Sequence, residues 1–329
     1  MTTASVLLTV GTTWGTITDK NDKEKENARS LNVAEIAARE LRETPNTREQ
    51  SLRIMREWIQ KNTDIRNVRQ DDAFLLRFLR QKKFSIPMAQ QTLLKFLSLK
   101  NYYPEIFKNL DCEDPNLEEI ISNGYIAVSP VRDTRGRRVI VYSIGSFNAT
   151  KFNCWDMCRA HAVVYMSLLE DQQEQVCGFV HVGDGNGVTT AHISTWNPTD
   201  FARLMKWGEQ SVPMRHKEFH MICPTAFKYI VDFAISKISS KMAQRLYFHA
   251  NTKQLLKHLE PDCLPSTFGG AIPLQDMIDF TRQLVRNQRK KVVGHDDMEL
   301  LSTRGIISSR SKNNDINSVQ GSFRKLEID

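Results

Sequence analysis

Two cations, Lys241 and Arg245, stand four residues apart in the segment SKMAQRL. At this spacing two side chains lie on the same face of an α-helix, so a helix here would form a paired basic site. The segment directly before it, AFKYIVDFAIS, instead carries apolar residues at offsets 0, 3, 4, 7 and 8. That spacing predicts an apolar stripe along a helix, formed by Phe227, Ile230, Val231, Ala234 and Ile235. The sequence thus predicts an apolar helix that is followed at once by a basic site.

The charge of the whole chain agrees with an anionic partner. Its 329 residues include 45 Lys and Arg against 38 Asp and Glu, which gives a formal net charge of +7. This excess favours nucleic acid or an acidic membrane surface as the partner, although a soluble protein with a merely basic surface has the same balance. No stretch approaches the ~18 uncharged apolar residues of a membrane-spanning helix, so we expect any membrane contact to be peripheral.

Motifs for catalysis or cofactor binding are weak. The glycines of GDGNG (183–187) follow an apolar run, but a dinucleotide-binding fingerprint needs a third glycine where Val188 stands. A tight turn after a strand is therefore the better interpretation. The sequence contains no GxxxxGK[ST] phosphate-binding loop, no GxSxG nucleophile motif and no HExxH zinc motif. We predict that the protein is not an enzyme and that it holds no cofactor and no metal.

The patterns of cysteines and of basic residues argue against two further kinds of site. The six cysteines form no CxxC pair, and Cys154 and Cys158 have no second Cys or His pair at the spacing of a zinc site. We interpret the cysteines as reduced thiols of a cytosolic protein. The basic residues form no long run and match no nucleic-acid-binding module, so we expect no nucleic-acid partner.

Helical patterning dominates the first third of the chain. Residues 1–30 are polar and show no period, so we expect a flexible N-terminus. Asp71 is placed to cap the helix DDAFLLRFLRQKKF, and Thr47 with Gln50 matches a capping box for the helix before it. The sequence predicts an all-helical N-terminal subdomain over residues 31–110.

Short β-branched runs, separated by helix-length segments, follow this subdomain. The runs are RRVIVYSI, CGFVHVGDG, EFHMIC and RLYFHA, and one helix between them is predicted over residues 155–170. Strands that alternate with helices predict an α/β domain over residues 111–285, with a mostly parallel sheet and flanking helices. The Ser- and Asn-rich composition of residues 286–329 predicts a polar, disordered tail.

Five motifs occur in an order that resembles the CRAL-TRIO family. They are DDAFLLRFLRQKKF, VHVGDGNGV, SVPMRHKEFHMI, SKMAQRLYFHA and LPSTFGG, and the resemblance extends over about residues 35–285. Within the family, the sequence looks similar to the α-tocopherol transfer protein, the clavesins and cellular retinaldehyde-binding protein. The resemblance implies a lipid-binding domain in which a mobile lid helix covers an apolar cavity. It also implies a non-enzymatic carrier of hydrophobic small molecules.

The resemblance assigns roles to the apolar stripe and to the basic residues. The stripe at 227–235 matches the inner face of the lid, although an ordinary amphipathic helix packed on a core has the same spacing. Five cations match positions at which tocopherol-carrier relatives bind the phosphates of phosphatidylinositol bisphosphate: Arg80, Arg215, Lys217, Lys241 and Arg245. For each cation taken alone, a solvated surface charge is the alternative. Each cation near an anionic membrane contributes about 1 kcal/mol, so the set would hold a peripheral protein reversibly.

The resemblance also implies the walls of the cavity. The residues that match ligand-contacting positions are Cys158, His161, Tyr165, Phe179, Leu204, Trp207 and Val212. Most of them are apolar, as the burial of a hydrocarbon ligand requires. His161 and Tyr165 are polar and lie four residues apart on one helical face, so they can meet a hydroxyl or carbonyl group of a ligand. A hydrogen bond between these two side chains inside the core is an equally good interpretation.

Together these features predict a cytosolic lipid-transfer protein. It would carry one hydrophobic molecule of a tocopherol- or retinoid-like kind. It would exchange this molecule at endomembranes that contain phosphatidylinositol bisphosphate, with which it associates peripherally. The alternative is a trafficking adaptor that uses the same fold to sense phosphoinositides. By default we expect a monomer.

Overall fold

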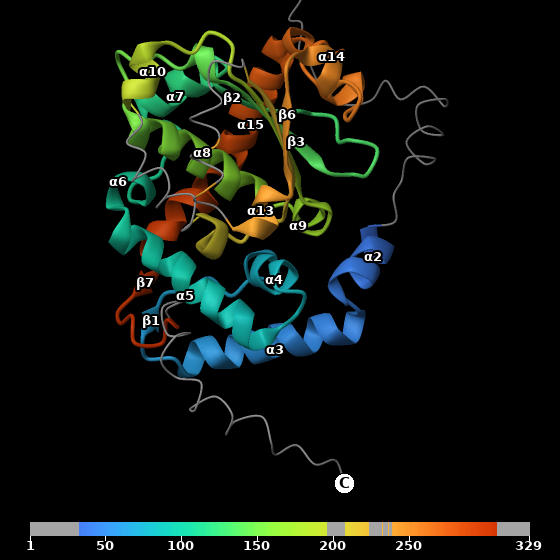
Figure 1. The fold of residues 1–329 in the computed structure, drawn as a ribbon. Helices are drawn as coiled ribbons and strands as arrows, with labels where there is room; N and C mark the ends of the chain where they lie inside the picture. The colour runs from blue at the N-terminus through green and yellow to red at the C-terminus, as the bar shows by residue number, and fades with distance from the viewer. Residues whose placement is uncertain (1–32, 196–207, 224–231, 233–235, 237–238, 308–329) are drawn as a thin grey trace, which may run out of the picture. The chain divides into compact units, whose positions relative to one another are not determined.

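The computed structural model of the protein describes residues 33–195, 208–223, 232, 236 and 239–307, all of which belong to one unit, Val33–Asp329. At the centre of this unit is a five-stranded sheet with the order β2-β3-β4-β5-β6 (Figure 1). The strands are β2 (Ile126–Val128), β3 (Arg138–Ser143), β4 (Phe179–Asp184), β5 (His216–Ile222) and β6 (Leu246–His249). Strand β2 is antiparallel to β3, and every other neighbouring pair is parallel. The predicted mostly parallel sheet is confirmed, with β2 as an additional edge strand.

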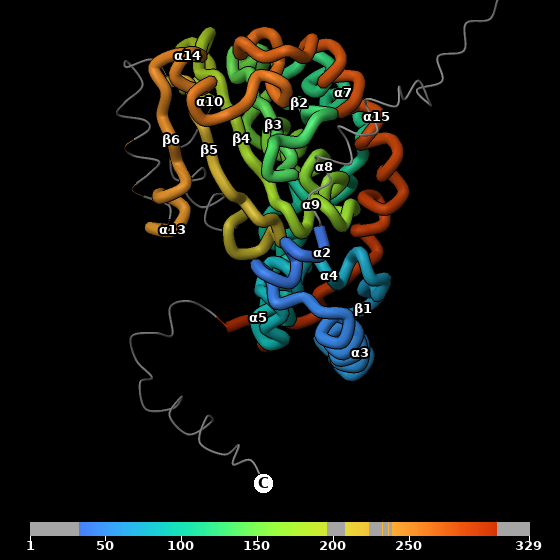
Figure 2. The backbone as a smooth tube through the Cα atoms, turned by 90° about the vertical axis from the view of Figure 1, so that its right-hand side faces the viewer, coloured from blue at the N-terminus to red at the C-terminus, as the bar shows by residue number. Residues whose placement is uncertain are grey.

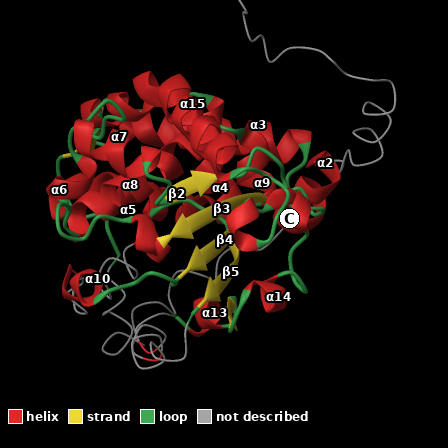
Figure 3. Cartoon of the chain, turned by 90° about the horizontal axis from the view of Figure 1, so that it is seen from above, coloured by secondary structure: helices red, strands yellow, loops and turns green. Residues whose placement is uncertain are grey.

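Alternate residues of the strands face two separate apolar cores. Ile140 and Phe179 belong to the core that contains helix α8 (Cys154–Leu168), whereas Val141 and Val182 belong to the core that contains helix α14 (Thr252–Leu255). Successive side chains of a strand point to opposite faces, so the β-branched runs cover both faces with apolar groups, as a buried parallel sheet requires. Figure 3 looks along the sheet, with α8 on one side and α14 on the other.

The helical region that precedes the sheet packs at one end of the strands, where Figure 2 shows α3, α4 and α5 together. Its elements are α2 (Val33–Ile36), η1 (Ala37–Leu41), α3 (Pro45–Lys61), α4 (Asp72–Gln81), α5 (Ile86–Tyr102), α6 (Pro104–Phe107) and α7 (Pro115–Ser122). The predicted cap of α4 is confirmed, because the Asp71 side chain accepts a hydrogen bond from the backbone N–H of Phe74. The predicted capping box at Thr47 is wrong. The helix begins earlier, because Pro45 favours the first helical turn and Thr44 caps it.

The elements that join and follow the strands complete the unit. They are η2 (Ile144–Ser146), α9 (Gln172–Cys177), α10 (Thr190–Thr195), α13 (Ser240–Ala243), η4 (Pro261–Cys263), η5 (Ser266–Phe268) and α15 (Leu274–Val293). Helix α15 packs beside α8 and the edge strand β2, where the Thr281 hydroxyl accepts a hydrogen bond from the backbone N–H of Val128. This side-chain contact satisfies a backbone donor at the edge of the sheet.

The segment after residue 285 differs from the predicted disordered tail. Helix α15 continues to Val293, η6 (Gly294–Asp297) follows, and strand β7 (Glu299–Leu300) pairs antiparallel with β1 (Ile65–Arg66). Although this segment is mostly polar, it contains several apolar residues, and Val292, Met298 and Leu300 are buried. The prediction was wrong for residues 286–307, because burial of these few side chains holds an otherwise polar segment. Residues 308–329 lie outside the described residues.

A buried ion cluster joins the helical region to the end of α8. Arg77 and Glu170 both have fully buried side chains, with 2.6 Å between Arg77 Nη2 and Glu170 Oε1. Arg69 also pairs with Glu170, at 2.8 Å. Burial alone would raise the pKa of Glu170, but the two guanidinium groups outweigh it and lower this pKa to about 2. The cluster therefore ties α4 to α8 and positions the helical region against the sheet domain.

Candidate functional site

A basic pocket of about 460 Å³ lies beside the starts of β5 and β6, next to the end of α4. Within the described part of the chain, seven basic side chains line it against two acidic ones, Glu40 and Glu209. The basic residues are Arg39, Lys82, Lys83, Arg215, Lys217, Lys241 and Arg245. Four of the five cations predicted from the sequence are thus brought together here, although they come from different elements.

Two lysines of the basic pocket were not identified from the sequence. Lys82 and Lys83 stand in the turn after α4, where Lys83 and the buried Phe84 both have left-handed backbone conformations, with φ of 51° and 61°. This sharp reversal places the two cations at the pocket instead of along a helix. Adjacent lysines after a helix were visible in the sequence, but their distance along the chain from β5 concealed the contact.

Lys241 and Arg245 do not share a helix, contrary to the prediction. Helix α13 ends at Ala243, and Arg245 stands in the turn before β6, where it donates a hydrogen bond to the backbone carbonyl of His216. The helix is short because the next strand must begin at Leu246 to pair with β5. Both cations nevertheless line the basic pocket.

Two of the predicted cations bind an acidic side chain of the same protein. Arg215 Nη2 and Lys217 Nζ lie 2.8 and 2.7 Å from Glu40 Oε2. Burial opposes the charged form of Glu40, but the hydrogen bonds from Lys217 and Arg215 outweigh it and lower the pKa of Glu40. The Glu40 carboxylate is therefore ionised and bridges both cations.

The other side of the pocket carries positive charge that its own acids do not balance. Lys82 is half-buried, and burial, together with repulsion from Lys95 and Lys241, lowers its pKa below the ordinary value, although Glu209 partly opposes this. Among the residues that the structure describes, Lys82, Lys83 and Lys241 form no ion pair. An anion that entered here would relieve the mutual repulsion of these lysines.

Arg80, the fifth predicted cation, does not line the pocket. Its side chain is only 4% exposed, and its guanidinium forms two hydrogen bonds with the Glu43 carboxylate, at 2.7 and 2.8 Å. A third hydrogen bond, 2.9 Å long, reaches Gln175 Oε1 on α9. In this arrangement Arg80 joins the helical region to α9 and offers no donor to an external anion, because removing it from Glu43 would leave a buried carboxylate unpaired.

A chain of six tyrosine and histidine side chains runs from Tyr125, just before β2, past α8 to the basic pocket. It begins with Tyr125 Oη 2.7 Å from His161 Nε2, and His161 Nδ1 lies 3.0 Å from Tyr165 Oη. Tyr165 Oη then lies 2.8 Å from Tyr142 Oη, which is 2.6 Å from His181 Nδ1. The hydrogen bond between His161 and Tyr165, one of the two alternatives that the sequence left open, is thus present as one step of a longer chain.

The last step of this His–Tyr chain reaches the basic pocket. His181 Nε2 lies 2.8 Å from Nδ1 of His216, whose residue lines the pocket. Burial lowers the pKa of His161 to about 4, and burial with the nearby Arg245 charge lowers that of His216 to about 4. Neutral imidazole has one donor and one acceptor nitrogen, so neutral rings can continue the chain of hydrogen bonds where charged ones cannot.

Apolar side chains adjoin the His–Tyr chain on the same face of the sheet. Phe219 stacks on His181 with 4.4 Å between ring centroids, and neither Phe219 nor Met221 is fully buried. On β6, Phe248 is 42% exposed. Gly183 leaves room for Met221, because a Cβ at that glycine would lie 2.5 Å from the Met221 sulfur. This face combines an apolar surface with a few polar groups, as sites for hydrophobic ligands do.

The residues predicted to line the cavity are only partly accounted for. Cys158, on the same helix as His161, is half-buried, and burial raises its pKa to about 12, so the thiol is neutral. Phe179 is fully buried, and Val212 is 8% exposed. Leu204 and Trp207 lie outside the described residues, as do the five residues of the predicted lid stripe.

Comparison with known proteins identifies the family. The model of the CRAL/TRIO domain matches residues 122–270, and that of the Pinta-like, UBA domain matches residues 44–117. Clavesin-1 of Xenopus laevis is 30% identical over 248 residues, which are 75% of this chain and 75% of clavesin-1. The chain belongs to the CRAL-TRIO family. Clavesin-2 of Homo sapiens is 28% identical over 261 residues, which are 79% of this chain and 80% of clavesin-2.

A solved structure is also similar to this CRAL-TRIO protein. The crystal structure of Sfh5 covers 76% of this chain and 99% of its own, with a TM-score of 0.47 and 12% sequence identity. That score is too low to establish a common fold. The family assignment is carried by the domain match and by clavesin-1, which together confirm the resemblance seen in the motifs.

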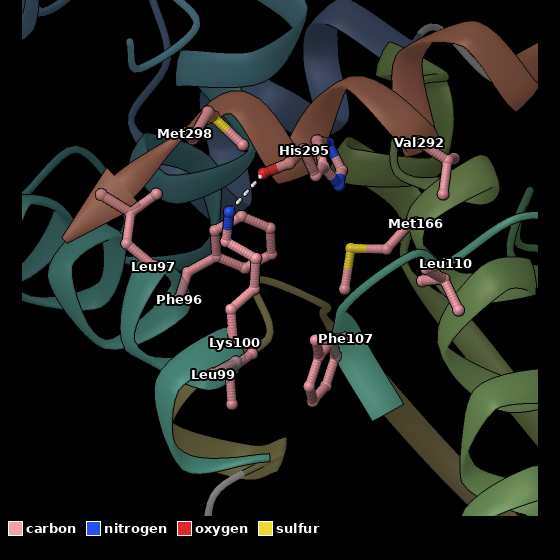
Figure 4. Close-up of a pocket in the computed structure, with 10 residues that line it drawn as sticks. All are labelled: Phe96, Leu97, Leu99, Lys100, Phe107, Leu110, Met166, Val292, His295 and Met298. Atoms are coloured by element: carbon pink, nitrogen blue, oxygen red, sulfur yellow. Dashed lines mark hydrogen bonds between the residues drawn. The ribbon is translucent and has the colours of Figure 1, made fainter. Parts of the chain in front are cut away.

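A second cavity in this CRAL-TRIO protein is too small for a lipid. It has a volume of about 20 Å³, room for about one water molecule, between α5, α8 and α15 (Figure 4). Beside it, Lys100 Nζ donates a hydrogen bond to the carbonyl of His295, at 3.1 Å. The lining side chains, such as Phe96 and Met166, pack the helical region against the sheet domain, so this cavity is a packing gap.

The segment GDGNG forms a turn in which the Asp184 carboxylate accepts a hydrogen bond from the Asn186 N–H, at 2.9 Å, as the sequence predicts. In the described ranges, no helix has the length and apolarity to cross a bilayer, and no three His, Cys, Asp or Glu side chains gather to hold a metal ion.

Proposed function

We propose that this CRAL-TRIO protein carries one hydrophobic small molecule and docks through its basic pocket on membranes that contain phosphatidylinositol bisphosphate. The observation that carries the proposal is the basic pocket, where seven cations meet two acids within the described residues. A phosphomonoester brings a charge of about −1.5 to −2 and three strong acceptor oxygens, so a headgroup with two of them suits a pocket of this charge. The proposed site of action is the cytoplasmic surface of endomembranes.

The ligand proposed for the sheet face is tocopherol- or retinoid-like, a largely hydrocarbon molecule with one polar group. Phe219 and Met221 would contact its apolar part, whose burial is favourable by about 25 cal/mol per Å². The His–Tyr chain beside them would supply a donor or an acceptor to a hydroxyl or carbonyl, since hydroxyl and imidazole groups can serve as either. The family resemblance supports a carrier that catalyses no reaction.

Lipid extraction and vesicle flotation together test the proposal. Mass spectrometry of the organic extract of the purified full-length chain should find one hydrophobic molecule per protein. Flotation should show binding to vesicles that contain phosphatidylinositol bisphosphate, with weaker binding at high salt, because exposed charges are screened over about 8 Å at physiological ionic strength. Vesicle binding without any extracted lipid would favour the phosphoinositide-sensing adaptor, and turnover of a lipid would favour an enzyme.

A further inference from the structure

The Glu40 carboxylate occupies the place that a bound anion would take between Arg215 and Lys217. One of its oxygens receives hydrogen bonds from both cations, at 2.8 and 2.7 Å. Its side chain remains 33% exposed, so it can turn out into water without disturbing the core. An external anion can therefore reach these two cations by replacing the carboxylate.

The backbone that carries Glu40 is held firmly beside the pocket. Ile36, Ala37 and Leu41, on both sides of it, are buried in the apolar core. The Glu43–Arg80 ion pair, with both side chains at most 8% exposed, anchors the chain just beyond. Anchoring on both sides keeps the carboxylate at a high local concentration beside its two cations, so it competes continuously with any external anion.

Glu209, the second acid of the pocket, differs from Glu40 in its contacts. It accepts a hydrogen bond of 2.5 Å from the Ser239 hydroxyl, and in the described part of the chain it bridges no pair of cations. Glu40 and Glu209 thus contribute the same charge to one pocket, but only Glu40 occupies donors that a phosphate would use. Removing Glu40 removes both a negative charge and a competitor for the donors, whereas removing Glu209 removes only a negative charge. Comparing the two therefore separates competition for donors from a general effect of charge.

We propose that Glu40 is an internal competitor that sets the strength of anion required to occupy the basic pocket. Displacing it weakens the binding of every external anion by the same factor. A monoanionic carboxylate or phosphodiester gains little over Glu40, whereas a phosphomonoester brings more charge and further acceptor oxygens to the same donors. Glu40 therefore sets an affinity threshold that phosphomonoesters pass and weaker anions do not, whether the phosphate belongs to a lipid headgroup or to a soluble inositol phosphate. This inference rests on the function proposed above and names the ligand chemistry of the same site.

The test compares the wild-type chain with Glu40→Gln, Glu209→Gln and Glu57→Gln. Glu57 is exposed on α3 and does not line the pocket, so its variant controls for the change in net charge. Binding of soluble inositol trisphosphate is measured by calorimetry. Glu40→Gln should tighten binding about 3- to 10-fold, since it removes a partly exposed ion-paired competitor. Glu209→Gln should tighten it by at most about twofold, and Glu57→Gln should not change it.

Flotation with vesicles that contain phosphatidylinositol bisphosphate forms the second arm. Tighter binding by Glu40→Gln in both arms supports the competitor and a lipid source of the phosphate. Tighter binding to the soluble probe alone supports the competitor and a free inositol phosphate as the ligand. If Glu40→Gln binds no more tightly than Glu209→Gln in both arms, the inference is overturned. Equal urea unfolding midpoints for the variants would exclude a folding effect.

Failure of this inference can be told apart from failure of the proposed function. If the wild type binds both probes and Lys241→Ala weakens that binding, but Glu40→Gln has no effect, only the competitor is wrong. If neither the wild type nor Lys241→Ala nor Glu40→Gln binds either probe, the proposed function fails and the competitor with it. If Glu40→Gln alone binds, the competitor is supported in its strongest form.

Discussion

The basic pocket and the His–Tyr chain meet at His216 but are opposite in their electrostatics. The pocket is open to water and gathers charged side chains, whereas the chain consists of neutral groups, of which Tyr125, Tyr142 and His181 are buried. Water around the pocket screens much of the repulsion between its crowded cations. A few ångströms inside, burial instead lowers the pKa of His181 and of its neighbour His216. The same sheet thus supports a charged site and an uncharged one, and desolvation decides between them.

The largest expected effect comes from interrupting the His–Tyr chain. His181→Phe leaves Tyr142 Oη and His216 Nδ1 without the partners that they have at 2.6 and 2.8 Å. Unsatisfied buried polar groups cost about 1–3 kcal/mol each, so we expect the free energy of unfolding to fall by about 2–6 kcal/mol in urea titrations. Vesicle binding should change by less than about twofold. Equal stability of variant and wild type would show that water replaces the missing ring and therefore has access to the His–Tyr chain.

Acid should destabilise the neutral chain next most strongly. The folded pKa of His161 is about 4, below its ordinary value of 6.5, so between these values the unfolded state binds the proton and the folded state does not. The stabilising contribution of His161 is therefore complete above pH 6.5 and is lost as the pH falls toward 4. We expect a loss of about 2–3 kcal/mol from this residue between pH 7.5 and 4.5.

The control for this pH dependence is His161→Gln, which cannot titrate. Urea unfolding of both proteins at the two pH values isolates the contribution of His161 to the change in the free energy of unfolding. The contribution of the carboxylates is the same in both proteins. The variant should lose about 2–3 kcal/mol less than the wild type on acidification. Parallel losses in the two proteins would mean that His161 is accessible to water and ordinary in its titration.

Removing cations from the basic pocket should weaken membrane binding without the same effect on stability. Lys241→Ala/Arg245→Ala should weaken binding to vesicles with phosphatidylinositol bisphosphate by about 2 kcal/mol, or about 30-fold, since each cation contributes about 1 kcal/mol. The matched control is Lys253→Ala/Lys257→Ala, two exposed lysines four residues apart that do not line the pocket. Comparable losses in both double variants in flotation would indicate a diffuse charge effect instead of a site.

The smallest effect is expected for a cation that only the tertiary structure revealed. Lys82→Ala should weaken vesicle binding by about 1 kcal/mol, or about fivefold, because it removes one half-buried cation from the unbalanced side of the pocket. Lys253→Ala serves as its single-residue control. If flotation titrations show no difference between these two variants, Lys82 does not contribute to the site, and the anion binds only the other pocket residues.

The amino-acid sequence by itself was sufficient for the family, the sheet and several local structures. The runs that became β3 to β6 contain apolar residues that are β-branched in β3 and β4 and mostly aromatic or unbranched in β5 and β6, and the Asp71 cap of α4 is a local contact, so neither depends on distant residues. The basic charge of four pocket residues was likewise visible, because the motifs of the family place them. Local pattern and resemblance can go this far because they use only neighbouring residues or aligned positions.

The tertiary structure alone decided which charges are free to bind and which are already paired. Arg80 and Arg215 both matched phosphate-binding positions, yet Arg80 is buried against Glu43 and Arg215 shares Glu40 with Lys217. The tertiary structure alone also decided the pairing of β7 with β1, which joins residues near 65 to residues near 300. Ion pairing and burial depend on which distant segments are brought within a few ångströms of each other, and one sequence does not encode that distance in any local pattern.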